Sequence, residues 1–486
     1  TVVFDEYPGD AFETTLGEDG LLPGAVSSWL QRTEEVPFEN WTDLLEHRHD
    51  EQRRADALLY FDETGTERDE LAVLEDSHAH ALTPTIVFAL LISERLGNDF
   101  EHADISDDGR KATYNREINQ LDIMTPPDLD YASGIVALDG TPTVDMWEDC
   151  LGERLNHRPV LQDEEREEYI KQALNLNLIR TSEYIKPYNS ANHVNVEADA
   201  ALLNEIADMH DEKPGVITTS TAEQEYLNAD ESLPIAETKH YGNVLGSNEF
   251  KTKRVGAVIG SNHYGDHYIK KWAAYSGEVA ERGEGKGSDL DYGEYGNKVL
   301  QHMREHETLQ AAMRYGRDGN GAVVYVHTDT LPDWVPLAGE GRVLKTWSDG
   351  MRSVIDALEC LESPTTNEIV EYPTVDISRQ QVFEHCETLR DKGVLSRKQN
   401  PEDGRGVVWI GDDLHNLGEH GDAELPSTDL DELEDDEVRQ LAHNTIYTSQ
   451  LTNFDEKQSG SEADATISTK SAQSPGERPT ATPPPD

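Results

Sequence analysis

The sequence predicts an α/β protein with parallel sheets, followed by a small helical unit that ends in a hairpin and by a disordered tail. Short β-rich segments alternate with helical segments up to about residue 345, which is typical of parallel strands joined by helices. Three helices and a hairpin are indicated over residues 347–411. From about residue 425, Asp, Ser, Thr and Pro predominate without an apolar period, which predicts disorder.

The chain is strongly acidic along its whole length. Its 486 residues include 97 Asp and Glu but 41 Lys and Arg, for a net charge of −56. A disordered acidic protein would share this charge, but 36% of the residues are apolar and many lie in patterned runs. We therefore expect a folded, carboxylate-coated protein from a halophilic source, because molar salt screens repulsion between surface charges.

Cysteine content and hydropathy exclude several classes of protein. The three cysteines are too scattered for a disulfide framework, and they lack the CxxC spacing of zinc and redox sites. No apolar run reaches the roughly 18 residues that a membrane-spanning helix needs. We expect a cytoplasmic protein that does not enter a membrane.

Four units are expected along the chain. The first begins with a strand that ends at Asp5, and its polar, helically periodic middle part predicts a helical insertion at about 9–125. A strand is expected again at 134–143, and further strands at 214–220, 254–261 and 321–328 belong to the second unit. The expected bounds of the units are residues 1–150, 151–345, 346–415 and 416–486.

Two strand ends carry residues suited to phosphate chemistry. An apolar strand ends in Asp5 and Glu6, and nucleotides bind at the carboxyl edge of parallel sheets. An Asp there can hold Mg²⁺ through water, and a Glu can orient an attacking water molecule. The next strand ends in LDGTPT, where a small polar residue can sense a phosphate. By themselves, an acidic strand end and a Gly-Thr-Pro turn are also common structural features.

A third pattern is a set of three residues on one helix face. Gln310, Arg314 and Arg317 are spaced i, i+4 and i+7, directly before an apolar strand. Surface ion pairs with Glu307 or Asp318 would explain the two arginines. A pair of arginine fingers that reach the γ-phosphate of a nucleotide is the alternative.

In this order the motifs resemble the motor core of superfamily 2 DExD/H-type helicases, from their motif II to their motif VI, over residues 1–335. The resemblance implies ATP and Mg²⁺ as cofactors, with Mg²⁺ held by Asp5 through water. It implies an incomplete first RecA-like domain and a second RecA-like domain, both with parallel sheets. The residues that it assigns are Asp5, Glu6, Gln310, Arg314 and Arg317 to catalysis, and Gly140, Thr141, Pro142, Gly260 and Asp266 to coupling.

The chain departs from the family pattern in two ways. The segment between motifs II and III is much longer than usual, which we attribute to the insertion. The P-loop pattern GxxxxGK[ST] is missing, since RGEGKGSD at 282–289 has Gly287 in place of Ser or Thr and does not follow a strand. We expect the carboxyl-terminal portion of a helicase-like protein, with poor ATP binding by itself and with an unpaired sheet edge and exposed core in the first unit.

Residues 346–415 predict a winged helix-turn-helix. Ser378 can cap the third helix, Val382, Cys386 and Leu389 form its inner stripe, and Gly393 ends it before a hairpin. Such units bind DNA or contact proteins, and the basic residues favour DNA. The candidate nucleic-acid residues are Arg379, Arg390, Lys392, Arg397, Lys398 and Arg405 here, and Lys251, Lys253, Arg254, Lys270 and Lys271 in a strand-tracking groove of the second unit.

The leading hypothesis is an ATP-dependent nucleic-acid motor portion that acts in DNA replication or in a mobile element. A non-enzymatic DNA-binding replication or regulatory protein with a degenerate motor fold is the alternative. A metal-dependent nuclease is a third hypothesis. It would use Asp76, His78 and His80, or His263, Asp266 and His267.

Overall fold

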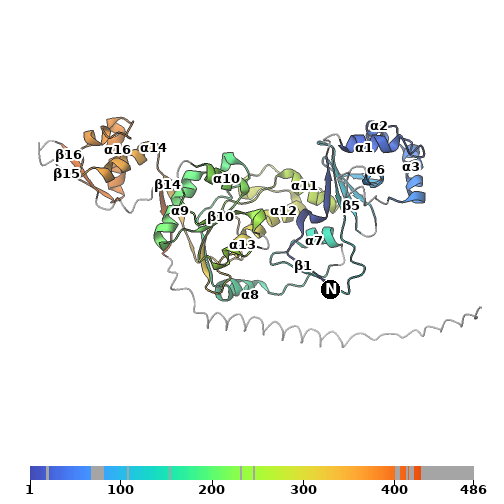
Figure 1. The fold of residues 1–486 in the computed structure, drawn as a ribbon, viewed down its shortest axis with the longest axis horizontal. Coiled ribbons are helices and arrows are strands. Elements are labelled where there is room, and N and C mark those ends of the chain that lie inside the picture. Colours follow the sequence, from blue (N-terminus) through green and yellow to red (C-terminus); the bar gives the residue numbers. More distant parts are fainter. Residues whose placement is uncertain are drawn as a thin grey trace, which may run out of the picture.

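A parallel six-stranded sheet with helices on its faces forms the centre of the molecule, which is a mixed α/β protein (Figure 1). The structure is a computed structural model. It describes residues 1–17, 21–66, 81–106, 109–152, 155–229, 233–244, 247–399, 406–411, 414 and 421–427.

A two-stranded parallel sheet forms the first unit. β1 (Val2–Asp5) pairs with β7 (Ile135–Leu138), so Asp5 lies beside Leu138 at a common carboxyl edge. Several apolar side chains of this pair are exposed, among them Val3 at 56% and Leu138 at 48%, whereas Val2 and Phe4 are half-buried. The predicted strand that ends at Asp5 is thus present, and part of its apolar surface is exposed.

The insertion is not purely helical, which corrects the prediction for residues 9–125. Among the described residues of the insertion, four helices pack with a five-stranded antiparallel sheet of order β2-β6-β5-β4-β3. Its strands escaped prediction because they bury polar side chains that break the apolar alternation; Glu101 and Asp122 are both fully buried. The elements are β2 (Glu13–Leu16), α1 (Leu21–Leu30), α2 (Trp41–His47), α3 (Glu51–Thr64), α6 (Thr83–Ile92), β3 (Glu94–Arg95), β4 (Phe100–Asp104), β5 (Lys111–Asn115) and β6 (Gln120–Met124).

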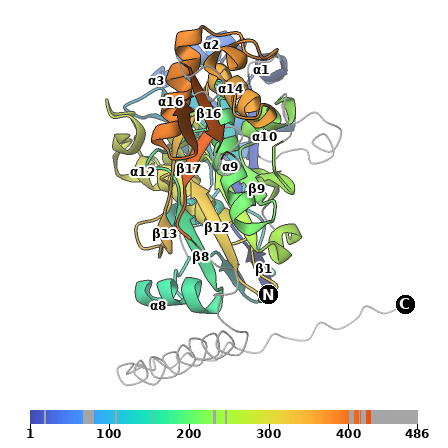
Figure 2. The same ribbon diagram turned by 90° about the vertical axis from the view of Figure 1, so that its left-hand side faces the viewer.

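The second unit is built on the parallel sheet, whose strand order is β10-β9-β11-β12-β8-β13; Figure 2 shows β9, β12, β8 and β13 of this sheet. Helices cover both faces, so β9, β11 and β12 are buried at every position, which explains their nearly continuous apolar sequences. These strands fall in the three predicted ranges. The strands are β8 (Leu176–Arg180), β9 (Gly215–Thr218), β10 (Glu237–His240), β11 (Val255–Ile259), β12 (Ala322–His327) and β13 (Gly339–Glu340).

The helices that connect the two sheets alternate with the strands. α7 follows β7 directly, and α11, α12 and α13 lie between β11 and β12. A π-helical turn, η7 (His302–His306), joins α12 to α13. The helices are α7 (Val144–Leu151), α8 (Asp163–Glu168), α9 (Val196–His210), α10 (Ser220–Asn228), α11 (Asp266–Tyr275), α12 (Gly293–Gln301) and α13 (Glu307–Ala312), with a π-helical turn at η2 (Tyr169–Ala173).

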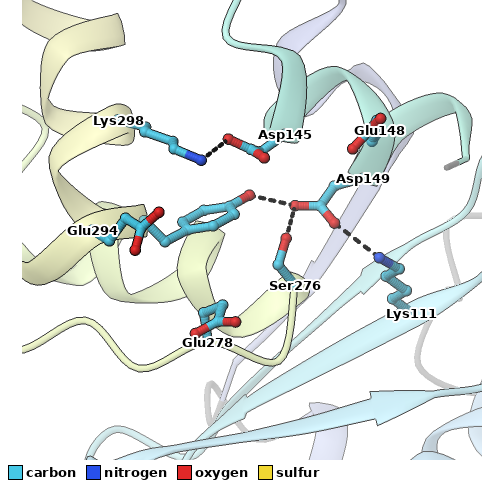
Figure 3. A pocket seen from close by; sticks show the side chains of 9 residues that line it. Lys111, Asp145, Glu148, Asp149, Ser276, Glu278, Glu294 and Lys298 are labelled. Carbon is cyan, nitrogen blue, oxygen red and sulfur yellow. Dashed lines mark hydrogen bonds and ion pairs between the residues drawn. The ribbon is translucent and has the colours of Figure 1, made fainter. Parts of the chain in front are cut away.

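Buried charges attach the first unit and its insertion to the second unit. Asp149 on α7 is 2% exposed, and its carboxylate accepts hydrogen bonds from Lys111 of β5 at 2.8 Å, from Ser276 at 2.8 Å and from Tyr295 of α12 at 2.7 Å (Figure 3). On the same interface, Glu13 of β2 accepts hydrogen bonds at 2.7 Å from Lys271 and Tyr275 of α11. The insertion is therefore fixed on α11 and α12.

The third unit has the predicted order of three helices and a hairpin. Ser378 caps α16, Val382, Cys386 and Leu389 are fully buried, and Gly393 has φ +84° just beyond the helix. The elements are α14 (Asp349–Cys360), α15 (Thr366–Val370), α16 (Arg379–Asp391), β15 (Leu395–Gln399) and β16 (Val407–Gly411). Its identity as a winged helix-turn-helix remains a prediction.

A strand from the predicted tail returns to the second unit. β14 (Arg342–Thr346) pairs antiparallel with β17 (Gly421–Glu424), so these last residues are ordered and not disordered as expected for 416–486. Residues 428–486 lie outside the described part of the chain. In the part that is described, none of the helices has the length and apolar character that crossing a bilayer requires.

We predict that Asp149→Ala lowers the free energy of unfolding by about 3–5 kcal/mol, because it leaves the nearly buried Lys111 without its counter-ion. Urea denaturation at constant salt measures this loss. Lys298→Ala is the matched control from the same pocket, since its ion pair with Asp145 is 44% and 34% exposed and should contribute below about 1 kcal/mol. Equal losses in the two variants would contradict the attachment described for Asp149.

Candidate functional site

An ion pair joins the carboxyl edge of β1 and β7 to the turn that follows helix α13. Arg314 Nη2 donates to Glu6 Oε1 at 2.6 Å, although the two residues are 308 positions apart in the chain. The Arg314 side chain is 4% exposed and that of Glu6 30%. Glu6 has φ +87°, which is unusual for a residue with a side chain, and its backbone N–H donates to Leu138 at 2.8 Å. The predicted motif II and motif VI residues thus meet.

Gln310 connects the same helix to the turn after β7. Its Nε2 donates to Thr141 Oγ1 at 2.9 Å and more weakly to Asp139 Oδ1 at 3.5 Å. Asp139 also accepts from the Thr141 backbone at 2.8 Å and from the Trp147 indole at 2.9 Å. Burial raises the pKa of Asp139, and the charge of Glu6 adds to this effect. Asp139 was not predicted as a site residue, although its position at a strand end could have indicated it.

Two histidines add further contacts between the turn after β7 and the helical segment that carries Gln310. Thr143 Oγ1 lies 3.2 Å from His302 Nδ1 and 3.3 Å from His306 Nδ1. Burial lowers the pKa of His302 to about 3 and that of His306 to about 4, so both are neutral near pH 7. They occupy the π-helical turn before α13, a local structure that often marks functional sites. Helical periodicity alone could not indicate their role.

The other predicted catalytic and coupling residues lie near this contact. Asp5 is exposed at the end of β1, and Arg317 is exposed one turn beyond Arg314, where its Nε donates to the Met313 carbonyl at 2.7 Å. Gly140 and Pro142 flank Thr141 in the turn after β7. The exposed side chains of Asp5 and Arg317 take no part in the ion pair between Glu6 and Arg314.

The loop after β11 is linked to the start of α13. Asn262 and Tyr264 both donate to the carboxylate of Glu307, the latter at 3.0 Å. Burial raises the pKa of Glu307 to about 7. Gly260 begins this loop with φ +74°, and a Cβ there would lie 2.7 Å from the Tyr188 ring, so glycine is required. The proposed motif V loop is therefore attached to α13, which carries Gln310 but ends at Ala312, so Arg314 and Arg317 lie in the turn beyond it and not on the predicted helix face.

The predicted metal cluster in this loop is not assembled. Asp266 binds Tyr292 at 2.5 Å and Arg282 at 3.2 Å, while His267 contacts Asn115 at 3.1 Å. Among the residues that the structure describes, no group of three His, Cys, Asp or Glu side chains could hold a metal ion. The second predicted cluster, Asp76, His78 and His80, lies outside the described residues.

The basic residues assigned to a strand-tracking groove lie in different parts of the second unit. Lys251, Lys253 and Arg254 precede β11 and lie at the amino edge of the parallel sheet, whereas Gly260 and Asp266 follow it at the carboxyl edge. The sequence places these sets close together, but a strand of five residues separates them. Lys270 pairs with Glu281 at 3.5 Å, and Lys271 is buried against Glu13 at 2.7 Å.

Most of the basic side chains predicted to form the DNA face of the third unit have partners. Arg390 and Arg397 both pair with Glu387, at 2.5 and 2.8 Å. Arg379 donates to Asn367 at 2.7 Å, and Lys392 lies 5.5 Å from the centroid of the Trp347 ring. Lys398 is exposed on β15, and Arg405 lies outside the described residues.

Comparisons with known proteins add no identification. No protein-family model matches the chain, and no curated protein matches its sequence significantly.

The raised pKa of Glu307 predicts a specific pH dependence of stability. In the folded protein the carboxyl stays protonated to about pH 7, whereas the ordinary value in the unfolded chain is 4.5. Between these values folding takes up a proton, so stability falls as pH rises through the window. Glu307→Gln removes this contribution.

As pH rises from about 5 to about 8, wild type should lose about 2–3 kcal/mol of its free energy of unfolding relative to the Glu307→Gln variant. Urea denaturation across this range measures the difference. A difference that does not change with pH would show that Glu307 ionises normally in the folded protein.

Proposed function

We propose that this chain is the helicase-like, ATP-dependent motor portion of a DNA-processing protein. The observation that carries the proposal is the pair of contacts Glu6–Arg314 and Thr141–Gln310, which brings the three proposed motifs together. The contacts join segments that are more than 150 residues apart, in the order that the motif pattern requires. The parallel sheet of the second unit is compatible with the proposed RecA-like domain.

The residues present fit part of an ATP site. Asp5 and Glu6 lie at a carboxyl strand edge, where Asp5 would hold Mg²⁺ through water and Glu6 would orient the attacking water. Arg314 and Arg317 would bind the γ-phosphate from the opposite side. ATP with Mg²⁺ supplies the phosphoryl group and the charge that these side chains recognise. Since the ion pair already holds Arg314 on Glu6, phosphate binding would compete with that contact.

The sequence has no P-loop to bind the remaining phosphates. The exposed apolar residues of β1 and β7 support the proposal that a further strand and P-loop pair with this sheet in a longer protein, because parallel strands are normally covered on both faces. Val3, Ile135 and Leu138 would then become core residues.

The third unit would provide duplex contacts as a winged helix-turn-helix, supported by its order of helices and hairpin. The acidic composition supports a halophilic, cytoplasmic setting, and we propose replication or a mobile element as the process. The ion pairs of Arg390 and Arg397 imply that phosphate contacts there must displace Glu387.

A non-enzymatic DNA-binding protein is a second candidate, and the Glu6–Arg314 ion pair also favours it. In a remnant without nucleotide chemistry, this pair would be a structural contact between the two units. Arg390→Ala should then weaken DNA binding, while changes at Glu6 and Arg314 should leave DNA binding unaltered.

The motor proposal predicts that the native protein hydrolyses ATP faster with single-stranded DNA. Glu6→Gln should lower the hydrolysis rate by roughly 10²-fold or more, and Arg314→Ala by about 10³-fold, while DNA binding persists. Phosphate release with and without DNA, together with DNA-binding titration, measures these effects.

Arg317→Ala should also slow hydrolysis. Arg32→Ala is its matched control, because this exposed arginine makes the same bond from Nε to the carbonyl four residues earlier, at 3.0 Å. Hydrolysis that is absent in the native protein, or insensitive to Glu6→Gln, would refute the motor proposal.

A further inference from the structure

A pocket of about 950 Å³ lies at the carboxyl edge of the parallel sheet. Its floor is formed where β8 and β12 end, and its other wall by β14 and the end of β17. Ligands of open α/β sheets bind at such edges, and the volume is within the range of small-molecule sites. The pocket lies at the edge opposite to Lys251, Lys253 and Arg254, and none of the residues predicted for nucleic-acid binding lines it.

The floor of the pocket carries buried polar groups with unused hydrogen-bonding capacity. His327 at the end of β12 is 2% exposed; its Nδ1 lies 2.9 Å from Thr181 Oγ1, and its Nε2 has no hydrogen-bond partner among the described residues. Asp199, which does not line the pocket, is 3.6 Å from this Nε2, too far for a hydrogen bond, and its carboxylate accepts from Tyr188 at 3.0 Å and from Tyr226 at 2.9 Å. The unpartnered Nε2 of His327 is a favourable partner for a polar ligand.

An aromatic ring stands at the rim on a rigid turn. Tyr184 is 75% exposed, yet its backbone is fixed on both sides. Its N–H donates to Ser182 Oγ at 3.1 Å, and its carbonyl accepts from the Asp329 backbone at 3.0 Å. A fixed, exposed ring can stack on a flat ligand with little loss of conformational entropy.

Two cations of the pocket, Arg342 on the opposite wall and Arg180 where β8 ends, have partners that are easily displaced. Arg342 pairs with Glu424 at 3.1 Å, and their side chains are 72% and 65% exposed. Arg180 pairs with Asp329 at 3.0 Å and also with Glu340. Exposed ion pairs contribute little stability, so a phosphate group can take the place of the carboxylate at Arg342.

We propose that this pocket holds one nucleotide of single-stranded DNA, with its base stacked on Tyr184, the base edge toward His327 and a phosphate at Arg342. A stacking ring, hydrogen-bonding groups for a base edge and a guanidinium on the far wall are the three elements that nucleotide recognition requires. The proposal rests on the proposed DNA-processing function and assigns its strand-binding site to the carboxyl edge. A free nucleotide shares this chemistry, so the test distinguishes the two sources.

The test is fluorescence anisotropy of a labelled oligothymidylate titrated with the full chain. Tyr184→Ala should weaken binding by about tenfold or more, because loss of one stacked base has roughly this effect. Tyr184→Phe keeps the ring and should bind within about twofold of wild type. Tyr131→Ala is the matched control, since this tyrosine is 95% exposed and does not line the pocket, and it should bind as wild type.

Competition with AMP separates the two sources. We expect excess AMP not to displace the oligonucleotide, because a strand makes further backbone contacts. Displacement by excess AMP would overturn the proposal in favour of a free-nucleotide site. Wild-type binding that Tyr184→Ala leaves intact would overturn the pocket proposal alone. A wild-type chain that binds no oligonucleotide would overturn the proposed DNA-processing function together with it.

Discussion

The ion pair between Glu6 and Arg314 determines how the two α/β units face each other. Glu6 follows β1 and therefore lies at the carboxyl edge of the small sheet, whereas Arg314 precedes β12 and lies on the amino-edge side of the large sheet. Because the two residues form an ion pair, these two edges face each other. Gln310 and the two histidines of the π-helical turn add neutral hydrogen bonds to the turn that follows β7. Arg314 is almost fully buried, so Glu6 supplies the counter-charge without which this guanidinium would be costly to bury.

Sequence reasoning succeeded where local chemistry determines structure. The buried strands β9, β11 and β12 are β-branched runs that are covered on both faces, and α16 has its cap, its stripe and its terminal glycine within sixteen positions, Ser378 to Gly393. It failed in the insertion because Glu101 and Asp122 are buried through partners elsewhere in the chain, such as Arg48 for Glu101. Strand β17 was missed because its pairing with β14 depends on a distant segment and not on its own composition.

In the candidate site, too, the residues that local sequence indicates were predicted and those that depend on distant contacts were not. The helical spacing of Gln310 and Arg314 was visible, and so was the acidic strand end at Glu6, but Asp139, His302 and His306 depend on contacts across more than 150 residues. The basic residues predicted to line a groove are separated for a topological reason. Residues before and after one parallel strand lie close in sequence but at opposite edges of the sheet, so charge clustering along the chain did not become clustering in space.

The attachment of the insertion restricts how a motor of this design could move. Asp149 lies on α7, which follows β7 after one turn, and its carboxylate is tied to β5, α11 and α12. If the whole small sheet rotated to separate Glu6 from Arg314, α7 would move with it. This rotation would strain the buried ion pair of Asp149 with Lys111, at a cost of several kcal/mol. A displacement of α13 would leave the hydrogen bonds of Asp149 intact, because none of them involves α13. Such a displacement would reach the loop after β11 through Glu307, which lies directly after η7.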